Sequence, residues 1–276
     1  MFKTTIAALA AASLLALTAC NQQPAAGNNS TSTAAAADAI NGTWKADLAS
    51  VQVDQKPDEL LLKDGKFDCP TCTPPLTVAA DGTYHAVTGR PYADEISVKA
   101  DDDHNVTRTD KKGGKVVGEN KLSVSADGKT LTVSFVDSST PDAKPVTGNY
   151  TETRVAAAPA GAHAISGSWK PEKYNSVTEE GLTTTYQLAG DTVNMSSPAG
   201  QSYSAKIGGP EAPIKGDIGG TTVTVEKVDG GIRETYHRDG KVTGVATSTV
   251  GADGKMSVTY ENKLNGSTTK YTASKS

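Results

Sequence analysis

Short apolar stretches alternate with polar residues along most of the chain after residue 40, and tight-turn signals separate them. Ile96–Val98 and Val223–Val225 show the two-residue period of a strand with one solvated face. Asp-Gly pairs such as Asp127–Gly128 join neighbouring stretches, which is typical of β-hairpins. No stretch after residue 20 has a convincing helical period, so the pattern predicts an all-β body.

The body is an internal duplication whose matching segments occur in the same order in both copies. The matches are GTWK at 42–45 with GSWK at 167–170, GKVVG at 114–118 with GKVTG at 240–244, and ADGK at 126–129 with ADGK at 252–255. We therefore expect one complete domain over 40–155 and a second over 165–276, joined by a Pro/Gly/Ala linker at 156–164.

Each copy has about seven or eight predicted strands at the spacing expected of a sandwich or a barrel. Consecutive hairpins favour an up-and-down meander, and closing the meander removes its exposed edges. The expected fold is thus two tandem up-and-down antiparallel β-barrels.

The N-terminal segment carries targeting information. Lys3 precedes an apolar run over Ile6–Leu17, which is shorter than the roughly 20 residues of a membrane span. The sequence LTAC at 17–20 follows, and it resembles the lipobox of bacterial lipoproteins. That resemblance implies a signal peptide over 1–19 and a lipid on Cys20 that anchors the chain to a membrane. Residues 20–39 are rich in Ala, Asn, Ser and Thr, and are expected to form a flexible stalk.

The location follows from the same resemblance. We expect a lipid-anchored protein of the bacterial cell envelope. Asn21 stands where the sorting rule for inner-membrane retention would place Asp, so delivery to the outer membrane is favoured. The net charge of −4, with both signs interspersed, argues against a nucleic-acid partner, because such partners call for a basic patch.

Gly42–Trp44 and Gly167–Trp169, each on a predicted first strand, resemble the G-x-W signature of lipocalin-like barrels. In that family the tryptophan plugs the closed barrel end, and a basic residue of the last strand packs over it. The resemblance implies that Trp44 pairs with Arg154, and Trp169 with Lys275. Lipocalin members differ widely in ligand, so the resemblance names none.

Cys69 and Cys72 form a C-x-x-C motif in a compartment where disulfides persist. A structural disulfide is the expected role. A redox pair and a metal site with His85 or His104 are the alternatives, although Thr73–Pro75 opposes the helix that lowers a redox thiol's pKa.

Asp101, Asp103 and Asn105 alternate as Ca²⁺ ligands do, but the positions where an EF-hand needs Gly and Glu hold Val106 and Lys112. A solvated hairpin turn is expected there, and no metal site is predicted.

No catalytic motif of a hydrolase, nucleotide-binding or zinc-dependent enzyme is present, so we expect a non-enzymatic protein without catalytic residues or a cofactor. The leading hypothesis is a barrel that binds a small apolar ligand. The alternative is a packed barrel that acts on an envelope protein, for example as a hydrolase inhibitor or an assembly factor. Several tyrosines either line a barrel mouth or belong to the core: Tyr84, Tyr92, Tyr186, Tyr203, Tyr236 and Tyr260.

Overall fold

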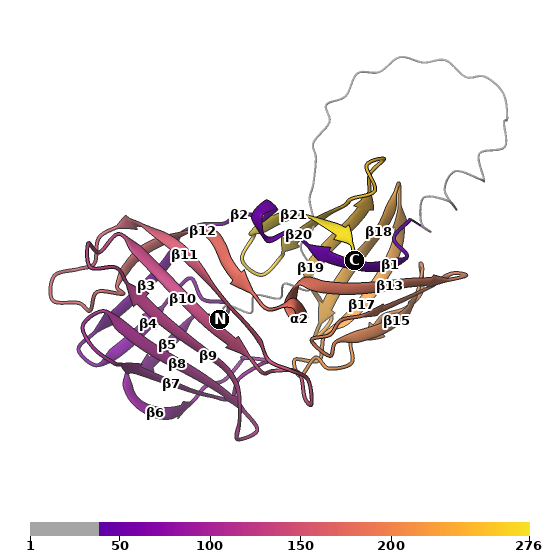
Figure 1. Ribbon diagram of the computed structural model, residues 1–276. Coiled ribbons are helices and arrows are strands. Elements are labelled where there is room, and N and C mark those ends of the chain that lie inside the picture. The colour runs from indigo at the N-terminus through magenta and orange to yellow at the C-terminus, as the bar shows by residue number, and fades with distance from the viewer. Residues whose placement is uncertain (1–38) are drawn as a thin grey trace, which may run out of the picture.

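The computed structural model describes residues 39–276, which form two antiparallel sheets that each curl into a nearly closed barrel (Figure 1). The all-β class and the two barrels predicted from the sequence are confirmed. Within residues 39–276, no helix is long and apolar enough to cross a membrane.

The first barrel is a sheet of ten strands in the order β5-β4-β3-β12-β11-β10-β9-β8-β7-β6. Its strands are β3 (Asp58–Lys63), β4 (Lys66–Cys69), β5 (Leu76–Ala79), β6 (Asp81–Ala86), β7 (Glu95–Ala100), β8 (Asn105–Lys112), β9 (Lys115–Val124), β10 (Thr130–Asp137), β11 (Val146–Ala156) and β12 (Gly167–Val177).

The second barrel has the order β15-β14-β13-β1-β21-β20-β19-β18-β17-β16, and β2 pairs with β21 beside this path. Its strands are β1 (Gly42–Ala46), β2 (Gln52–Asp54), β13 (Thr183–Ala189), β14 (Thr192–Ser196), β15 (Ser202–Lys206), β16 (Ala212–Pro213), β17 (Thr222–Val228), β18 (Gly231–Arg238), β19 (Lys241–Val250), β20 (Met256–Asn262) and β21 (Thr268–Lys275). Each barrel therefore has more strands than the seven or eight expected, because short edge strands such as β16 add to the meander.

The predicted hairpins and alternation form as expected. The β8–β9 hairpin turns at Gly113 and Gly114, which both have positive φ (57° and 76°), as a two-residue turn of this twist requires. Along β8, buried and partly exposed side chains alternate, so Val106, Arg108 and Asp110 face the interior of the first barrel.

The first strands of the two repeats are exchanged. β1 inserts between β13 and β21 of the second barrel, and β12 inserts between β3 and β11 of the first. Two connections make the exchange. One carries a 3-10 turn, η1 (Leu48–Ser50), together with β2, and the other carries the short helix α2 (Glu179–Leu182). Both lie between the barrels in Figure 1.

This exchange corrects the domain boundaries expected from the repeats, which were 40–155 and 165–276. The first barrel runs continuously over 58–177, and it is inserted between β2 and β13 of the second. The expected linker at 156–164 instead joins β11 to β12 within the first barrel. His163 N donates to Leu62 O at 2.9 Å, and Lys63 Nζ donates to Ala160 O at 3.2 Å, which ties this segment to the β3–β4 turn.

The exchange also corrects the tryptophan–cation pairs. Trp169 pairs in register with Arg154 of its new neighbour β11, and the Arg154 guanidinium carbon lies 4.0 Å from the indole centroid. Trp44 pairs in register with Lys275, whose Nζ lies 5.2 Å from the indole centroid. Each cation thus covers the tryptophan of the other repeat, because each last strand is joined to the first strand of the other repeat.

Trp44 and Trp169 are 2% and 0% exposed, and each closes one end of a barrel. Both indole N–H groups donate to the carbonyl oxygen four residues earlier, on Ile40 at 2.7 Å and on Ile165 at 2.8 Å. Arg154 further donates to the carbonyl oxygens of Gly128, Ala164 and Ser166, which fixes the chain over the closed end.

The opposite, open ends of the barrels meet each other. In the first barrel this mouth consists of the loops 70–75 and 87–93. In the second it consists of the loop 214–221 and of the turns at 239–240 and 263–267. Tyr92 of the first mouth and Thr221 of the second lie in direct contact, with 3.1 Å between their hydroxyl oxygens.

Candidate ligand-binding site at the junction of the barrels

A cavity of about 750 Å³ lies between the two mouths, and residues of both barrels line it. We call it the junction cavity. Tyr92 and Tyr174 line it from the first barrel, and Met195, Tyr236 and Tyr260 from the second. Its volume is within the roughly 300–1,000 Å³ of small-molecule sites, and such sites combine an apolar lining with a few placed polar groups.

The interior of the second barrel is filled below this cavity. Between Trp44 and Tyr186 only about 10 Å³ of free space remains, which is room for about one water. Glu234 occupies the centre, and its carboxylate accepts from the hydroxyls of Tyr186 at 3.0 Å, Tyr203 at 2.7 Å and Tyr236 at 3.2 Å. Burial raises the pKa of Glu234, while the three hydroxyls oppose that shift.

The aromatic floor of the cavity comes from adjacent hairpins. Tyr236 on β18 and Tyr260 on β20 flank β19, and their ring centroids are 6.3 Å apart in an edge-to-face arrangement. Tyr236 is 9% exposed and also belongs to the Glu234 cluster, so the core of the second barrel holds this ring in place.

Tyr92 joins the two mouths. Its ring fits against Gly219, where a side chain would bring its Cβ within 2.4 Å of two ring carbons. The guanidinium carbon of Arg238 lies 4.7 Å from the ring centroid, and Arg238 Nη2 donates to the Tyr92 hydroxyl and, at 2.8 Å, to Thr221 Oγ1. Burial raises the pKa of Tyr92 well above its ordinary value, so this hydroxyl stays protonated.

Arg90 is the second arginine of the cavity lining, and it is only 5% exposed. Its Nη2 donates to the carbonyl oxygens of Pro74 and, at 2.7 Å, of Pro75. Its Nη1 is buried without a hydrogen-bond partner among residues 39–276. Burial lowers the pKa of Arg90, and the nearby Arg108 adds to that effect.

Asp58 lines the cavity at the start of β3 and is 6% exposed. Gln55 Nε2 donates to Asp58 Oδ2 at 3.0 Å, but burial dominates and raises the pKa of Asp58 to about 7. Glu152 lies inside the same barrel, and neither of its carboxyl oxygens has a hydrogen-bond partner in the described part of the chain. Burial, together with the charge of Asp58, raises the pKa of Glu152 to about 9.

The cysteines predicted to form a disulfide do so. Cys69 and Cys72 are bonded, with 5.3 Å between their Cα atoms, and both are buried. The bond joins the end of β4 to the 70–75 loop of the first mouth, and Cys72 lines the junction cavity. Among residues 39–276, no group of three or more potential metal ligands comes together.

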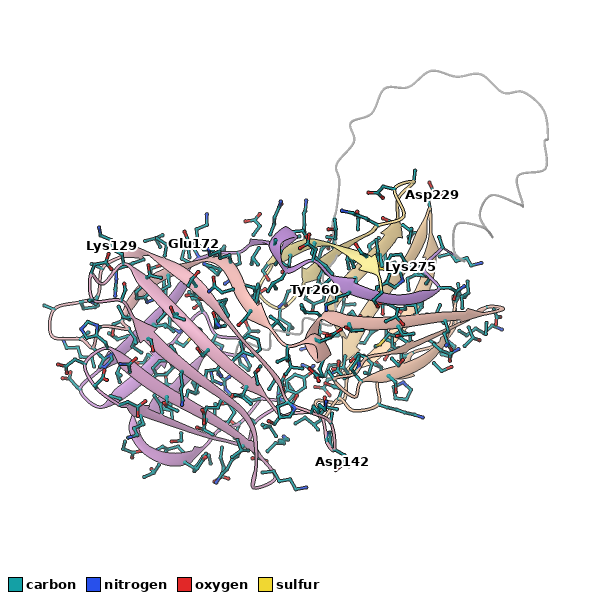
Figure 2. All side chains as sticks on the ribbon, viewed as in Figure 1. Lys129, Asp142, Glu172, Asp229, Tyr260 and Lys275 are labelled. Atoms are coloured by element: carbon teal, nitrogen blue, oxygen red, sulfur yellow. A yellow bond between two sulfur atoms is a disulfide. The ribbon has the colours of Figure 1, made fainter. Side chains whose placement is uncertain are left out.

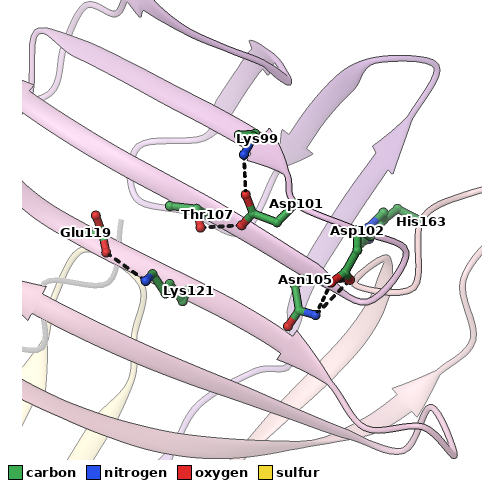
Figure 3. A network of polar contacts seen from close by, with 8 residues as sticks. All are labelled: Lys99, Asp101, Asp102, Asn105, Thr107, Glu119, Lys121 and His163. Carbon is green, nitrogen blue, oxygen red and sulfur yellow. Dashed lines mark hydrogen bonds and ion pairs between the residues drawn. The ribbon is translucent and has the colours of Figure 1, made fainter.

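The acidic turn at 101–105 is occupied by its own protein contacts (Figure 3). Asp102 Oδ1 accepts from the backbone N–H groups of His104 at 2.8 Å and Asn105 at 2.9 Å, and Asp101 accepts from Thr107 at 2.5 Å. These contacts are those of the hairpin turn that the sequence predicts.

Asp81, Thr83 and His85 form an exposed cluster on the edge strand β6. His85 Nε2 lies 2.9 Å from Asp81 Oδ1 and 3.1 Å from Thr83 Oγ1. A nucleophile–base relay needs the acid on one ring nitrogen and the nucleophile on the other. Here both neighbours contact the same nitrogen, so the cluster does not have that geometry.

Some of the tyrosines line the mouths of the barrels, and others belong to the core. Tyr92, Tyr236 and Tyr260 line the junction cavity, whereas Tyr186 and Tyr203 surround Glu234 in the core. Tyr84 is 37% exposed beneath Lys111. Arg90, Arg238 and Asp58 carry no sequence signal of a site, because they are isolated charged residues in loops and at strand ends that only the fold brings to one cavity.

Cys20 and the signal and stalk segments lie outside the described residues. Comparison with protein-family models, with curated proteins and with solved structures found no match to this chain.

Proposed function

We propose that the protein is a non-enzymatic, lipid-anchored component of the bacterial cell envelope that binds one small, largely apolar ligand in the junction cavity. The observation that carries the proposal is a cavity of about 750 Å³ lined jointly by both barrels. A lipocalin-like protein holds its ligand inside one barrel. Here the second barrel leaves only about 10 Å³ beside Trp44, so the proposed site is the junction cavity instead.

The architecture gives the binding step a physical basis. Apolar surface moved from water into a preformed cavity contributes roughly 25 cal/mol per Å². Four tyrosine rings and Met195 supply such surface, and the arginines and Asp58 provide polar groups that orient a ligand. Leu264, which is 49% exposed, stands at the rim on the β20–β21 turn and provides an apolar approach to the cavity.

A filling variant tests the site. Thr269 on β21 lines the cavity, and Thr272 on the same strand does not. N-phenyl-1-naphthylamine, a neutral apolar fluorophore, is expected to bind the wild-type protein at one site. Thr269→Trp should weaken this binding at least about tenfold, because the indole takes up cavity space beside Tyr260, which pairs with Thr269, whereas Thr272→Trp should leave it unchanged.

Absence of saturable probe binding, or equal effects of the two variants, would overturn the proposed site. Native mass spectrometry of the protein purified from envelopes would then be used to look for the alternative, a bound envelope protein. The filled interior of the second barrel is the observation that favours this alternative of a packed interaction module.

Anchoring is tested separately. Cys20→Ala should abolish incorporation of labelled fatty acid and release the chain from the membrane fraction, with the β-sheet circular dichroism unchanged. Unaltered membrane retention and unaltered mature mass would contradict the lipid anchor.

A further inference from the structure

Two arginines from opposite barrels line one wall of the junction cavity. Arg90 comes from the 87–93 loop of the first mouth, and Arg238 from the end of β18 in the second. Tyr92 links them, because it follows Arg90 by two residues and contacts the Arg238 guanidinium.

Each arginine keeps a buried donor that nothing in the described chain satisfies. Arg90 Nη1 and Arg238 Nε are both buried and have no hydrogen-bond partner among the described residues. Buried donors in native proteins are nearly always paired, because leaving one unpaired costs about 1–3 kcal/mol of folding stability. The two arginines that line the cavity therefore keep hydrogen-bonding capacity that the described residues do not use.

Two other charged residues near the arginines have partners of their own, while Asp58, Asp239 and Lys241 also line the cavity. Arg108 next to Arg90 binds Asp110 through two hydrogen bonds of 2.9 and 2.8 Å. Asp217 of the second mouth accepts from Thr221 N at 2.7 Å. The Arg90 hydrogen bonds go to the carbonyl oxygens of Pro74 and Pro75, and the charge of Asp110, which also acts on Arg90, is bound by Arg108.

The cavity lining also includes apolar and aromatic side chains among its other polar residues. Met195, Ile214, Tyr236 and Tyr260 belong to the second barrel, and Val53 lies on β2, which pairs with β21. A ligand that satisfies the arginines and also covers this surface must have an anionic group at one end and an apolar body.

We infer that the ligand of the junction cavity is an anionic amphiphile, with a carboxylate or phosphate group held by Arg90 and Arg238 and an apolar body against Tyr236 and Tyr260. Guanidinium groups suit both anions, because their donors form paired hydrogen bonds with two oxygens of one group. This inference rests on the proposed function, since it names the class of ligand for the same cavity.

The experiment compares ligands that share one alkyl chain and differ in the head group. Isothermal titration calorimetry of the full folded protein would use dodecanoate, dodecyl phosphate, dodecanol and dodecyltrimethylammonium, with acetate and inorganic phosphate as head groups alone. We expect at least one of the two anionic amphiphiles to bind about 10- to 100-fold more tightly than dodecanol, as one or two charge-assisted hydrogen bonds provide. The cationic amphiphile should bind most weakly.

Variants assign the preference to the arginines. Arg90→Gln and Arg238→Gln should each reduce the ratio of anion affinity to dodecanol affinity, both measured on the same variant, at least about fivefold. Saturable dodecanol binding to each variant reports that the cavity is still present. Arg238→Lys should retain part of the advantage. Arg233→Gln, an exposed arginine on the same strand β18 that pairs with Glu226 at 3.8 Å, is the matched control and should change nothing.

Each outcome decides a different point. Equal affinities for dodecanoate, dodecyl phosphate and dodecanol would overturn this inference and leave the proposed function standing. Failure of every amphiphile to bind would overturn both. Acetate or phosphate binding as tightly as the amphiphiles would overturn the apolar part of the inference. The stronger of the two anionic amphiphiles distinguishes a carboxylate from a phosphate ligand.

Discussion

Lys275 lies over the indole ring of Trp44, with Nζ 5.2 Å from the ring centroid, although the two residues belong to the last and first strands of different repeats. Arg154 and Trp169 form the reciprocal pair. Strand exchange creates both contacts, so Trp44 belongs to the second barrel and Trp169 to the first. Replacing one tryptophan therefore tests the stability of one barrel.

Trp44→Ala should destabilise the second barrel by about 3–5 kcal/mol, since it empties a fully buried site. Hydrogen exchange followed by mass spectrometry should show faster exchange in β13 and β17–β21, with β3–β11 nearly unaffected. Trp169→Ala should give the opposite pattern. Loss of protection in β3–β11 on replacing Trp44 would contradict the exchange.

Residues 56–178 should fold alone as a cooperative β-domain, because they contain every strand of the first barrel. The fragment 40–155 should be much less stable. It lacks β12, which pairs with β11 from Ser168 to Val177, and the five residues of β1 are too few to replace it. Urea unfolding followed by circular dichroism measures both fragments. Equal stability of the two would show that β1 can close the first barrel.

Glu152→Gln should stabilise the protein by about 3 kcal/mol at pH 7. The native pKa of Glu152 is about 9, against an ordinary value of 4.5, so the native state keeps a proton that the unfolded chain loses. Stability from this group is therefore complete below about pH 4.5 and falls by about 1.4 kcal/mol per pH unit up to about pH 9.

Chemical denaturation between pH 4 and pH 9 measures this effect. Glu152→Gln should flatten the profile. Glu172→Gln, at an exposed position on β12 (Figure 2), is the matched control and should follow the wild type. An unchanged slope in Glu152→Gln would show that Glu152 titrates normally in the native state.

Replacing both Cys69 and Cys72 by Ser should cost less than the ~3 kcal/mol estimated for a 15-residue loop, because this disulfide closes a much shorter one. Thermal unfolding measures the loss. Thiol alkylation of a native chain that begins after residue 20 should find no free thiol at either position. A readily alkylated thiolate at Cys69 or Cys72 would instead indicate a redox role.

The sequence by itself determined the local structure. The alternation along β8 and turns such as Gly113–Gly114 specify strands and hairpins from neighbouring residues, and the repeated GTWK and GSWK segments identify two related barrels. It also predicted the Cys69–Cys72 bond, whose partners are close in the chain. The sequence indicated only one feature of the junction cavity, namely that some tyrosines line a barrel mouth.

Only the tertiary structure decided which first strand completes which barrel. Both copies carry the same G-x-W pattern, so pairing preference at Trp44 and Trp169 does not distinguish the two last strands. The choice depends on the whole length of β12 against β11 and on where the connections through β2 and α2 lead. The junction cavity follows from that choice, because Tyr92 and Arg238 come into contact only when the two mouths are brought together.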